Sequence, residues 1–256
     1  MTQRYYVPQL PPDGGELDLP ETEAHHARTV MRARTGDQIE LFDGEGGSAK
    51  ATIQQIIKRQ IICQTEPLLQ SSDGIPVPVV MGVAFPKGDR SKLLIEKLTE
   101  LGVQECVPLS CERTQFAPSA GAIEKWRSAM LAACKQSGRN RLMEIDSGHS
   151  VINWFQEQPT ADTNWLNFIA HPETAEKGNP SPPFQQLLAE QILAAKSQDS
   201  AVEPTGIRIA IGPEGGFSPD EVEAAEAAGW QTVSLGQLVY RIETAAIVLA
   251  ALAIHR

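Results

Sequence analysis

The sequence has few cysteines and no long apolar run. Its four cysteines, Cys63, Cys106, Cys111 and Cys134, lack the paired spacing of a metal site, so we expect buried or idle thiols rather than ligands or disulfides. The longest apolar run, Ala245 to Ile254, is too short to span a bilayer, and the N-terminus lacks the basic-then-apolar pattern of a secretory signal. We therefore expect a cytoplasmic protein that needs no metal.

The glycine-bearing part of the chain, residues 207–254, also lacks two common phosphate-binding motifs. Neither GxGxxG nor GxxxxGK[ST] occurs there, which argues against a dinucleotide or nucleoside-triphosphate enzyme. Instead, the apolar run from Ile207 to Ile211 predicts a short strand that is broken at once by the sequence GPEGG. Glycines in such a loop let the backbone approach a ligand closely. Taken alone, however, GPEGG is better explained as a plain strand-to-helix turn.

A helix start follows this glycine loop. Ser218 has the position of an N-cap, Pro219 that of the first helical residue, and Glu221 that of the second half of a capping box. The acidic side chains Asp220, Glu221 and Glu223 would repel a phosphate at this helix end. We therefore predict a ligand without phosphate that is nucleoside-like or cationic.

A second predicted strand, Trp230 to Leu235, also ends in a glycine, Gly236, and a loop with Tyr240, Arg241 and Glu243 comes next. Ligands of parallel α/β sheets bind beyond the carboxyl ends of the strands. Two such loops in succession therefore predict one binding crevice between them.

Charge is spread unevenly along the chain. The net charge of −10 divides into −4 over residues 1–84 (7 basic, 11 acidic), +4 over 85–141 (10 basic, 6 acidic) and −10 over 142–256 (5 basic, 15 acidic). The basic middle segment is suited to contacts with nucleic-acid phosphates, and the acidic C-terminal half to a cationic cofactor and a protein or solvent surface. Ordinary solvated helix surface is the alternative for any single Lys or Arg.

The pattern of elements changes near residue 70. Before it, β-type runs at 4–7, 38–42, 49–57 and 60–67 surround one expected helix at 21–32, which predicts a small, mostly β domain. After a linker-like segment with two prolines, expected strands at 77–84, 105–110, 142–145, 165–170, 207–211 and 231–235 alternate with helices. This alternation predicts a mostly parallel α/β sheet. The last helix is apolar on every side, so the sheet, another helix or a second subunit must cover it.

The two loops carry a resemblance to a known family. IGPEGGFS followed by LGxxxxRxETA is similar to the RsmE family of SPOUT-class methyltransferases, and RYYV, KGDRSK, ERTQF and KWRSAMLAACKQSGR match in order across the chain. The resemblance implies a trefoil-knotted α/β fold, with a PUA-like RNA-binding domain at residues 1–72 and a methyltransferase domain at 73–256. It further implies a homodimer that binds S-adenosylmethionine and methylates N3 of a uridine in 16S ribosomal RNA of the small subunit.

The resemblance also assigns site residues. Arg241 matches the family arginine and would orient the uracil and stabilise its anion; Glu243 is the second catalytic candidate, with Glu214 as the other nearby carboxylate. A structural Arg241–Glu243 pair is the alternative. The expected cofactor-binding residues are Ala170, His171, Ile211, Gly212, Pro213, Glu214, Gly215, Gly216, Leu235, Gly236, Leu238, Tyr240, Thr244 and Ala245. The expected RNA-binding residues are Arg4, Arg28, Arg32, Arg34, Lys87, Arg90, Arg113, Arg127, Arg139 and Arg141.

Three residues depart from the family pattern: Lys135, Tyr240 and Ile242. They bear on substrate preference more than on the reaction itself. Two other functions remain open from the sequence: a non-catalytic RNA-binding factor in ribosome assembly, and a methyltransferase that acts on another RNA.

Overall fold

The computed structural model describes residues 2–71, 74–75, 77–115, 118–157, 164–171, 180–197 and 204–255. The chain forms two compact units. One consists of Met1–Gly74 and Met130–Leu142, and the other of Ile75–Ala129 and Met143–Arg256. A short segment from the middle of the chain therefore belongs with the N-terminal unit. The expected boundary between residues 72 and 73 lies outside the described residues.

The first unit is built on a mainly antiparallel sheet. Its elements are β1 (Gln3–Tyr6), β2 (Gly15–Asp18), α1 (Glu21–Thr29), β3 (Gln38–Phe42), β4 (Gly47–Ile57), β5 (Gln60–Thr65) and β6 (Leu69–Gln70). The strand order is β1-β3-β4-β5-β2, with β6 beside β4, and only β1 and β3 run parallel among these pairings. Alternate residues of β4, among them Ala49, Ala51 and Ile53, enter the core, as the two-residue period of a strand requires. The sequence analysis missed β2 and β6.

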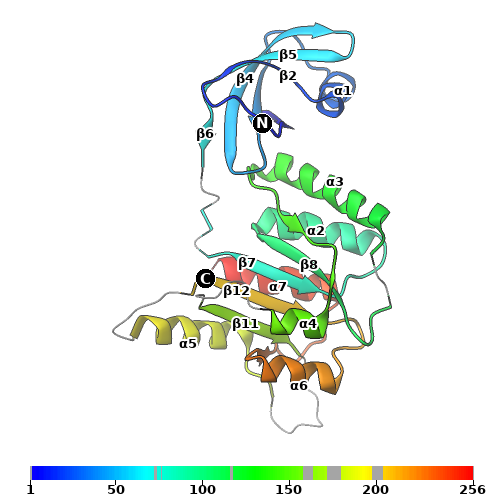
Figure 1. Ribbon diagram of the computed structural model, residues 1–256, viewed down its shortest axis with the longest axis vertical. Helices are drawn as coiled ribbons and strands as arrows, with labels where there is room; N and C mark the ends of the chain where they lie inside the picture. The colour runs from blue at the N-terminus through cyan, green and yellow to red at the C-terminus, as the bar shows by residue number, and fades with distance from the viewer. Residues whose placement is uncertain are drawn as a thin grey trace. The chain divides into compact units, whose positions relative to one another are not determined.

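The second unit is an α/β unit around a parallel sheet. Its elements are β7 (Val79–Val83), α2 (Asp89–Leu101), β8 (Glu105–Ser110), α3 (Ala120–Ser137, which continues into the first unit), β9 (Glu144–Ile145), β10 (His149–Ser150), α4 (Val151–Gln156), β11 (Trp165–Ala170), α5 (Phe184–Ser197), β12 (Gly206–Ile211), α6 (Pro219–Ala227), β13 (Gln231–Val233) and α7 (Ile242–Ile254). The order is β10-β8-β7-β12-β11-β13 with β9 beside β8, and every described pairing is parallel (Figure 1). The predicted mostly parallel sheet is confirmed.

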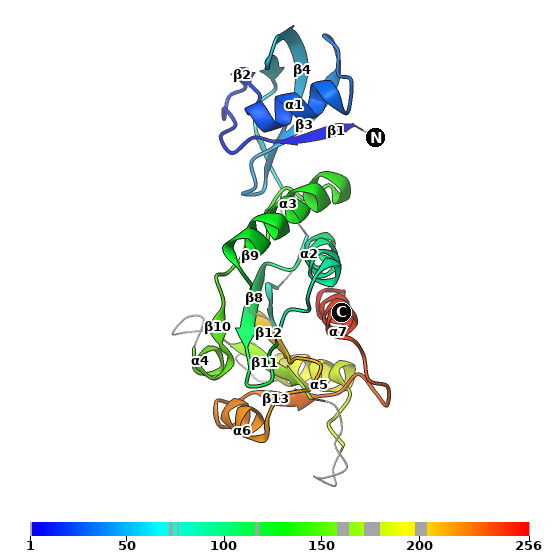
Figure 2. The same ribbon diagram turned by 90° about the vertical axis from the view of Figure 1, so that its right-hand side faces the viewer.

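Helices cover both faces of this sheet. On one face, Val80, Val107 and Ala210 pack with aromatic side chains from α4 (Trp154 and Phe155) and from the segments that flank α6 (Phe217 and Trp230). On the other face, α7 packs against α2, β7 and β12 (Figure 2). Successive strand residues point to opposite faces of the sheet. The continuous apolar runs of β7 and β12 therefore pack against the helices on both faces.

The C-terminal helix α7 is covered on one side only. Ala246, Leu249, Ala250 and Ala253 are buried, whereas Ile247, Val248, Ala251 and Leu252 are half-buried in the single chain. The expected cover on every side is therefore incomplete. The trefoil knot that the family resemblance implies stays a prediction.

A histidine on β10 links pH to stability. His149 Nε2 lies 3.0 Å from Asp146 Oδ2, and its Nδ1 lies 3.3 Å from Glu157 Oε1. Partial burial lowers the pKa of His149, but the hydrogen bond that its ring donates to Asp146 and the charges of Asp146 and Glu157 outweigh it, so the net pKa is raised. The stabilisation is present below the unfolded-state pKa and is lost as pH rises through the higher folded-state pKa.

We expect His149→Gln to reduce the free energy of unfolding by up to about 1 kcal/mol at about pH 5.5, and by much less at about pH 8.5. Urea titrations of both proteins at the two pH values measure this difference. An equal loss at both values would show that the contribution does not depend on the imidazolium charge.

Candidate active site

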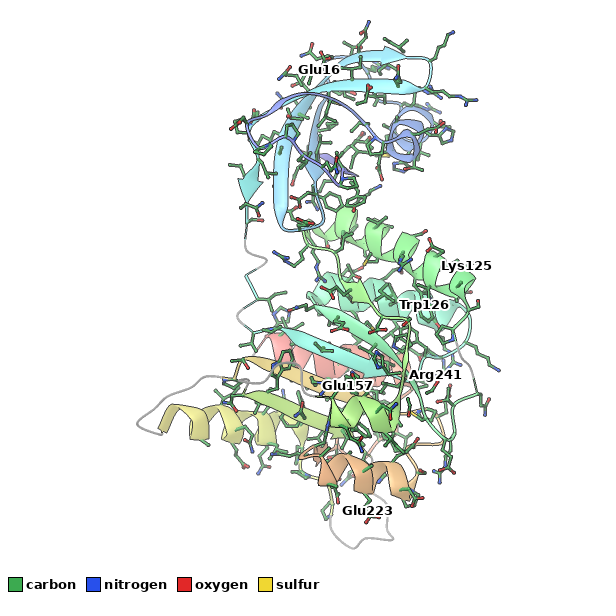
Figure 3. The ribbon with its side chains drawn as sticks, in the orientation of Figure 1. Glu16, Lys125, Trp126, Glu157, Glu223 and Arg241 are labelled. Carbon is green, nitrogen blue, oxygen red and sulfur yellow. The ribbon has the colours of Figure 1, made fainter. Side chains whose placement is uncertain are left out.

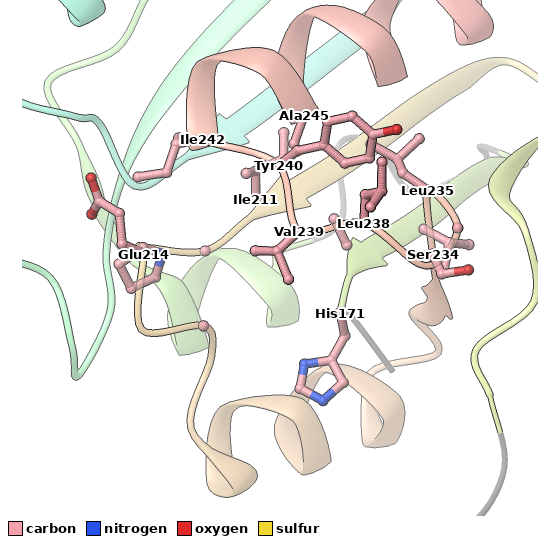
Figure 4. Close-up of a pocket in the computed structure, with 16 residues that line it drawn as sticks. His171, Ile211, Glu214, Ser234, Leu235, Leu238, Val239, Tyr240, Ile242 and Ala245 are labelled. Atoms are coloured by element: carbon pink, nitrogen blue, oxygen red, sulfur yellow. The ribbon is translucent and has the colours of Figure 1, made fainter. Parts of the chain in front are cut away.

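A pocket with a cavity volume of about 110 Å³ lies at the carboxyl ends of β11, β12 and β13. Figure 4 shows Glu214 at one end of this pocket and Ser234 and Leu235 at the other, with Tyr240 and Ala245 along one side. We call it the cofactor pocket, after the ligand that the sequence analysis predicts for its two loops. Its lining comes from the two loops that the sequence singles out, together with the end of β11 and the first turn of α7: Ala170, His171, Ile211, Gly212, Pro213, Glu214, Gly216, Val233, Ser234, Leu235, Gly236, Leu238, Val239, Tyr240, Ile242 and Ala245.

The glycine loop after β12 is held tightly. A Cβ on Gly212 would lie 3.1 Å from the ring of Phe217, and Gly216 has a φ of +70° that favours glycine. Arg113 donates hydrogen bonds to the carbonyl oxygens of Gly215 at 2.8 Å and Phe217 at 3.4 Å. The loop therefore presents backbone without side-chain bulk at its glycines, and the hydrogen bonds from Arg113 hold that backbone in place.

The predicted capping box of α6 is confirmed. Ser218 Oγ accepts from the Glu221 backbone N–H, and the Glu221 carboxylate accepts from the Ser218 N–H at 2.8 Å. The other oxygen of Glu221 accepts from the Glu112 backbone N–H at 2.7 Å, so the cap also ties the β8–α3 connection to the glycine loop. Glu221 is thereby occupied in holding the backbone.

We expect Ser218→Ala to lower the free energy of unfolding by about 1 kcal/mol, because the first turn of α6 loses a side-chain acceptor. Urea denaturation measures the loss. Ser128→Ala, at an exposed serine within α3, is the control and should leave stability almost unchanged. A Ser218→Ala protein as stable as the wild type would contradict the importance of the cap.

The second loop, between β13 and α7, presents large apolar side chains. Leu238 and Val239 line the cofactor pocket, although their exposed fractions are 73% and 86%. Strand β13 ends at Val233, two residues before the predicted end, and Ser234 follows with its Oγ donating to the Ser181 carbonyl at 3.0 Å. The loop therefore begins earlier than the sequence indicates.

The pocket brings together the expected cofactor residues except Gly215 and Thr244. It adds Val233, Ser234, Val239 and Ile242, which the sequence analysis missed. Each of these four stands next to a predicted loop residue or in the expected strand, so the only available signal was proximity in the chain. The assignment of the pocket to a particular ligand stays a prediction.

The two catalytic candidates occupy different environments. Arg241 is exposed and is the N-cap residue of α7, where its side chain forms no capping bond; in Figure 3 it lies on the side where the arrowheads of β7 and β8 end. Glu243 is 5% exposed, and its Oε2 has no hydrogen-bond partner among the described residues. The ion pair of Glu243 is with Arg90, whose Nη1 lies 3.9 Å from Oε2. An Arg241–Glu243 pair is not found among the described residues.

Two of the predicted RNA contacts, Arg4 and Arg139, have buried side chains. The Arg4 side chain is only 7% exposed; it donates to the Cys134 carbonyl at 2.8 Å and pairs with Glu40 at 3.2 Å. Arg139 is buried as well. Both arginines belong to the packing of the first unit, because the segment Met130–Leu142 is part of that unit.

The other predicted RNA contacts are more accessible. Arg28 is half-buried, and the exposed ones are Arg32, Arg34, Lys87, Arg127 and Arg141. Arg90 and Arg113 reach back to the glycine loop. Lys135, one of the departures from the family pattern, pairs at 2.6 Å with the buried Glu23. This departure therefore has a structural partner in the first unit.

The residues that the structure describes contain no helix long and apolar enough to cross a membrane. Nor do they contain a group of three or more His, Cys, Asp or Glu side chains arranged to hold a metal ion.

Comparisons with known proteins agree with this architecture. Residues 73–254 match the family model of the RNA methyltransferase domain, and residues 19–66 match that of the RNA methyltransferase PUA domain. The chain is 30% identical to the ribosomal RNA small subunit methyltransferase E of Synechocystis over 92% of this chain and 71% of the relative.

Two solved structures share the fold. A methyltransferase of Legionella pneumophila in complex with S-adenosylmethionine has a TM-score of 0.79 at 29% identity, covering 98% of this chain and 97% of that one. The ribosomal RNA small subunit methyltransferase E of Neisseria gonorrhoeae bound to S-adenosylmethionine has a TM-score of 0.79 at 25% identity, covering 98% and 96%.

The parallel sheet, the pocket at its carboxyl edge and the matched domains define an RNA methyltransferase with a SPOUT-type fold and an N-terminal PUA-like domain. More narrowly, the chain belongs to the ribosomal RNA small subunit methyltransferase E family, abbreviated RsmE.

Proposed function

We propose that this protein transfers a methyl group from S-adenosylmethionine to N3 of a uridine in 16S ribosomal RNA of the small subunit. The observation that carries the proposal is the cofactor pocket, which unites both predicted loops at the carboxyl edge of a parallel sheet. Family membership and the likeness to two structures solved with S-adenosylmethionine support the same reaction.

The chemistry of the lining suits S-adenosylmethionine. Ile211, Leu235 and Leu238 offer apolar surface to an adenine ring, as the lining of small-molecule sites commonly does. The Gly212 and Gly216 positions offer backbone without side-chain bulk, and the Glu214 carboxylate at one end suits a positive charge. When bound, S-adenosylmethionine supplies an electrophilic methyl carbon on a positively charged sulfur.

The remaining chemistry falls to the side chains near the start of α7. Uracil N3 must lose its proton before its electron pair can bond to the methyl carbon, and the carbon–sulfur bond electrons then stay on sulfur. A guanidinium at Arg241 would stabilise the negative charge that develops on the uracil. Glu214 and Glu243 are the candidate proton acceptors, and both alternatives remain open.

The division of labour along the chain is part of the proposal. Residues 1–72, as the PUA-like domain, would help to hold RNA through Arg28, Arg32 and Arg34, while residues 73–256 would carry the reaction. The accessible cations Lys87, Arg127 and Arg141 are further candidates for phosphate contacts. Because the side chains of Arg4 and Arg139 are buried, we leave these two residues out of the proposed RNA contacts.

We further propose that the protein is a cytoplasmic homodimer. Val239 and Leu238 are highly exposed, and α7 leaves the apolar residues Ile247, Val248 and Leu252 half-buried in the single chain. A second copy packed on this surface would remove it from water and enclose the loop between β13 and α7. Sedimentation of the purified protein measures its oligomeric state.

Transfer of labelled methyl to undermethylated small ribosomal subunits, followed by nucleoside mass spectrometry, tests the function. Appearance of 3-methyluridine is the expected result. Cofactor binding with methyl transfer only to another RNA would identify a different substrate, and absence of both binding and transfer would favour a non-catalytic RNA-binding factor.

A further inference from the structure

A second, smaller pocket lies beside the cofactor pocket, at the carboxyl ends of β7, β8 and β12. Its cavity volume is about 50 Å³, and its lining includes Phe85, Lys87, Arg90, Thr114, Gln115 and Glu214. Pro213 and Glu214 line both pockets, so occupants of the two would be neighbours across this part of the glycine loop. We call it the base pocket, and we infer that it receives the target pyrimidine, with Arg90 as the residue that positions and stabilises its imide edge.

The pocket chemistry matches the edge of uracil. That edge presents two carbonyl acceptors with one N–H donor between them, and loss of the N–H proton makes it negative. Lys87 and Arg90 are cationic donors at the lining. The Thr114 side chain is already engaged, because its Oγ accepts from the Cys111 N–H at 2.8 Å and it also hydrogen-bonds the Cys111 thiol, so donation to a base falls to Lys87 and Arg90. Cytosine carries an amino group in place of one of these carbonyls. It would therefore place a hydrogen-bond donor against the donors of the pocket.

Arg90 is held in place from two sides. Its Nη1 donates to Glu214 Oε1 at 3.2 Å and lies 3.9 Å from Glu243 Oε2. The buried Oε2 of Glu243 has no hydrogen-bond partner among the described residues, so Arg90 is its nearby counter-charge. In the described residues the hydrogen bonds of the Arg90 guanidinium involve only Nη1. Its remaining N–H groups can therefore donate to a base.

This arrangement connects the two pockets to α7. Glu214 belongs to the glycine loop, Glu243 to the first turn of α7, and Arg90 to the first turn of α2. The N-cap of the same α7 turn is Arg241, the proposed catalytic arginine. Arg90 therefore links the base pocket to the cofactor pocket through its contact with Glu214. This role rests on the proposed function, because the base in the pocket must be the one that is methylated beside the cofactor.

Photochemical cross-linking locates the base without turnover. Small-subunit ribosomal RNA containing 4-thiouridine is bound to the wild-type protein with S-adenosylhomocysteine, irradiated, and the linked peptides are identified by mass spectrometry. We expect links within residues 84–90 or 114–115. Links confined to other peptides, or no links, would overturn the base pocket. Links at these residues in a protein that makes no 3-methyluridine would refute the proposed reaction but not the pocket.

Kinetics of Arg90 variants test its role. Arg90→Ala should lower kcat/KM roughly a hundredfold while S-adenosylmethionine affinity stays near the wild-type value, and Arg90→Lys should recover part of the loss. The Arg90→Ala rate should recover partly at alkaline pH, where N3 loses its proton unaided. The exposed neighbour Lys92, paired with Glu96, provides the control Lys92→Ala, which should behave as wild type.

Two results would overturn this role. One is an Arg90→Ala protein with wild-type kcat/KM. The other is a loss of cofactor affinity as large as the loss of kcat/KM, which would show that Arg90 only shapes the glycine loop through Glu214.

Discussion

Replacing Arg241 with alanine should lower kcat for methyl transfer by roughly 10²- to 10³-fold, the scale expected when one donor to a developing negative charge is removed. The Arg241 side chain does not line the cofactor pocket, so affinity for S-adenosylmethionine should stay close to the wild-type value. Its side chain makes no capping bond to α7, so the helix should remain stable. Calorimetric titration of the cofactor and labelled-methyl transfer separate binding from chemistry.

Arg241→Lys provides the matched variant for this experiment. A lysine keeps the charge but lacks the planar fork of donors, so we expect an intermediate rate. Thermal unfolding of both variants should match the wild type. Nearly full turnover by Arg241→Ala would refute the catalytic assignment.

The second large effect is expected at Ala245, in the first turn of α7. This small residue lines the cofactor pocket, and Ala245→Trp would fill much of the space between α7 and the glycine loop (Figure 4). We expect the dissociation constant for S-adenosylmethionine to rise by roughly a hundredfold or more, equivalent to about 3 kcal/mol of binding free energy. Methyl transfer at moderate cofactor concentration should be lost accordingly.

Glu223→Trp is the control for added bulk. Glu223 is exposed on α6 and lies outside the cofactor pocket, with its position marked in Figure 3. This variant should bind the cofactor as the wild type does. Wild-type affinity in a folded Ala245→Trp protein, shown by circular dichroism and thermal unfolding, would place the cofactor elsewhere.

Features that depend on neighbours in the chain were predictable from the sequence. Ser218 and Glu221 form their capping box because they stand three residues apart at a helix start, where the side chain of each can accept the backbone N–H of the other. The α2 helix ends at Leu101, and the C-cap residue Gly102 that follows has a φ of +95°, a backbone conformation that favours glycine. Alternating strands and helices likewise predicted the parallel sheet, and with it the edge at which both loops meet.

Features that depend on distant residues were not predictable in this way. Nothing near Arg4 in the chain indicates that residues 134–140 supply its hydrogen-bond partners, so its charge suggested RNA. Lys135, read as a departure from the family pattern, finds Glu23 more than a hundred residues away. In both cases the sequence shows the charge but not the partner that neutralises it.

By itself, the sequence determined the local parts of this protein: the glycine loop, the helix cap, the strand and helix periods, and the motifs that mark its family. Tertiary structure decided which charges from distant parts of the chain face each other. Arg90 became the partner of Glu214 and Glu243 only when α2, the glycine loop and α7 were brought to one edge of the sheet. The physical reason is that backbone conformation follows from adjacent residues, whereas burial and ion pairing follow from the packing of elements far apart in the chain.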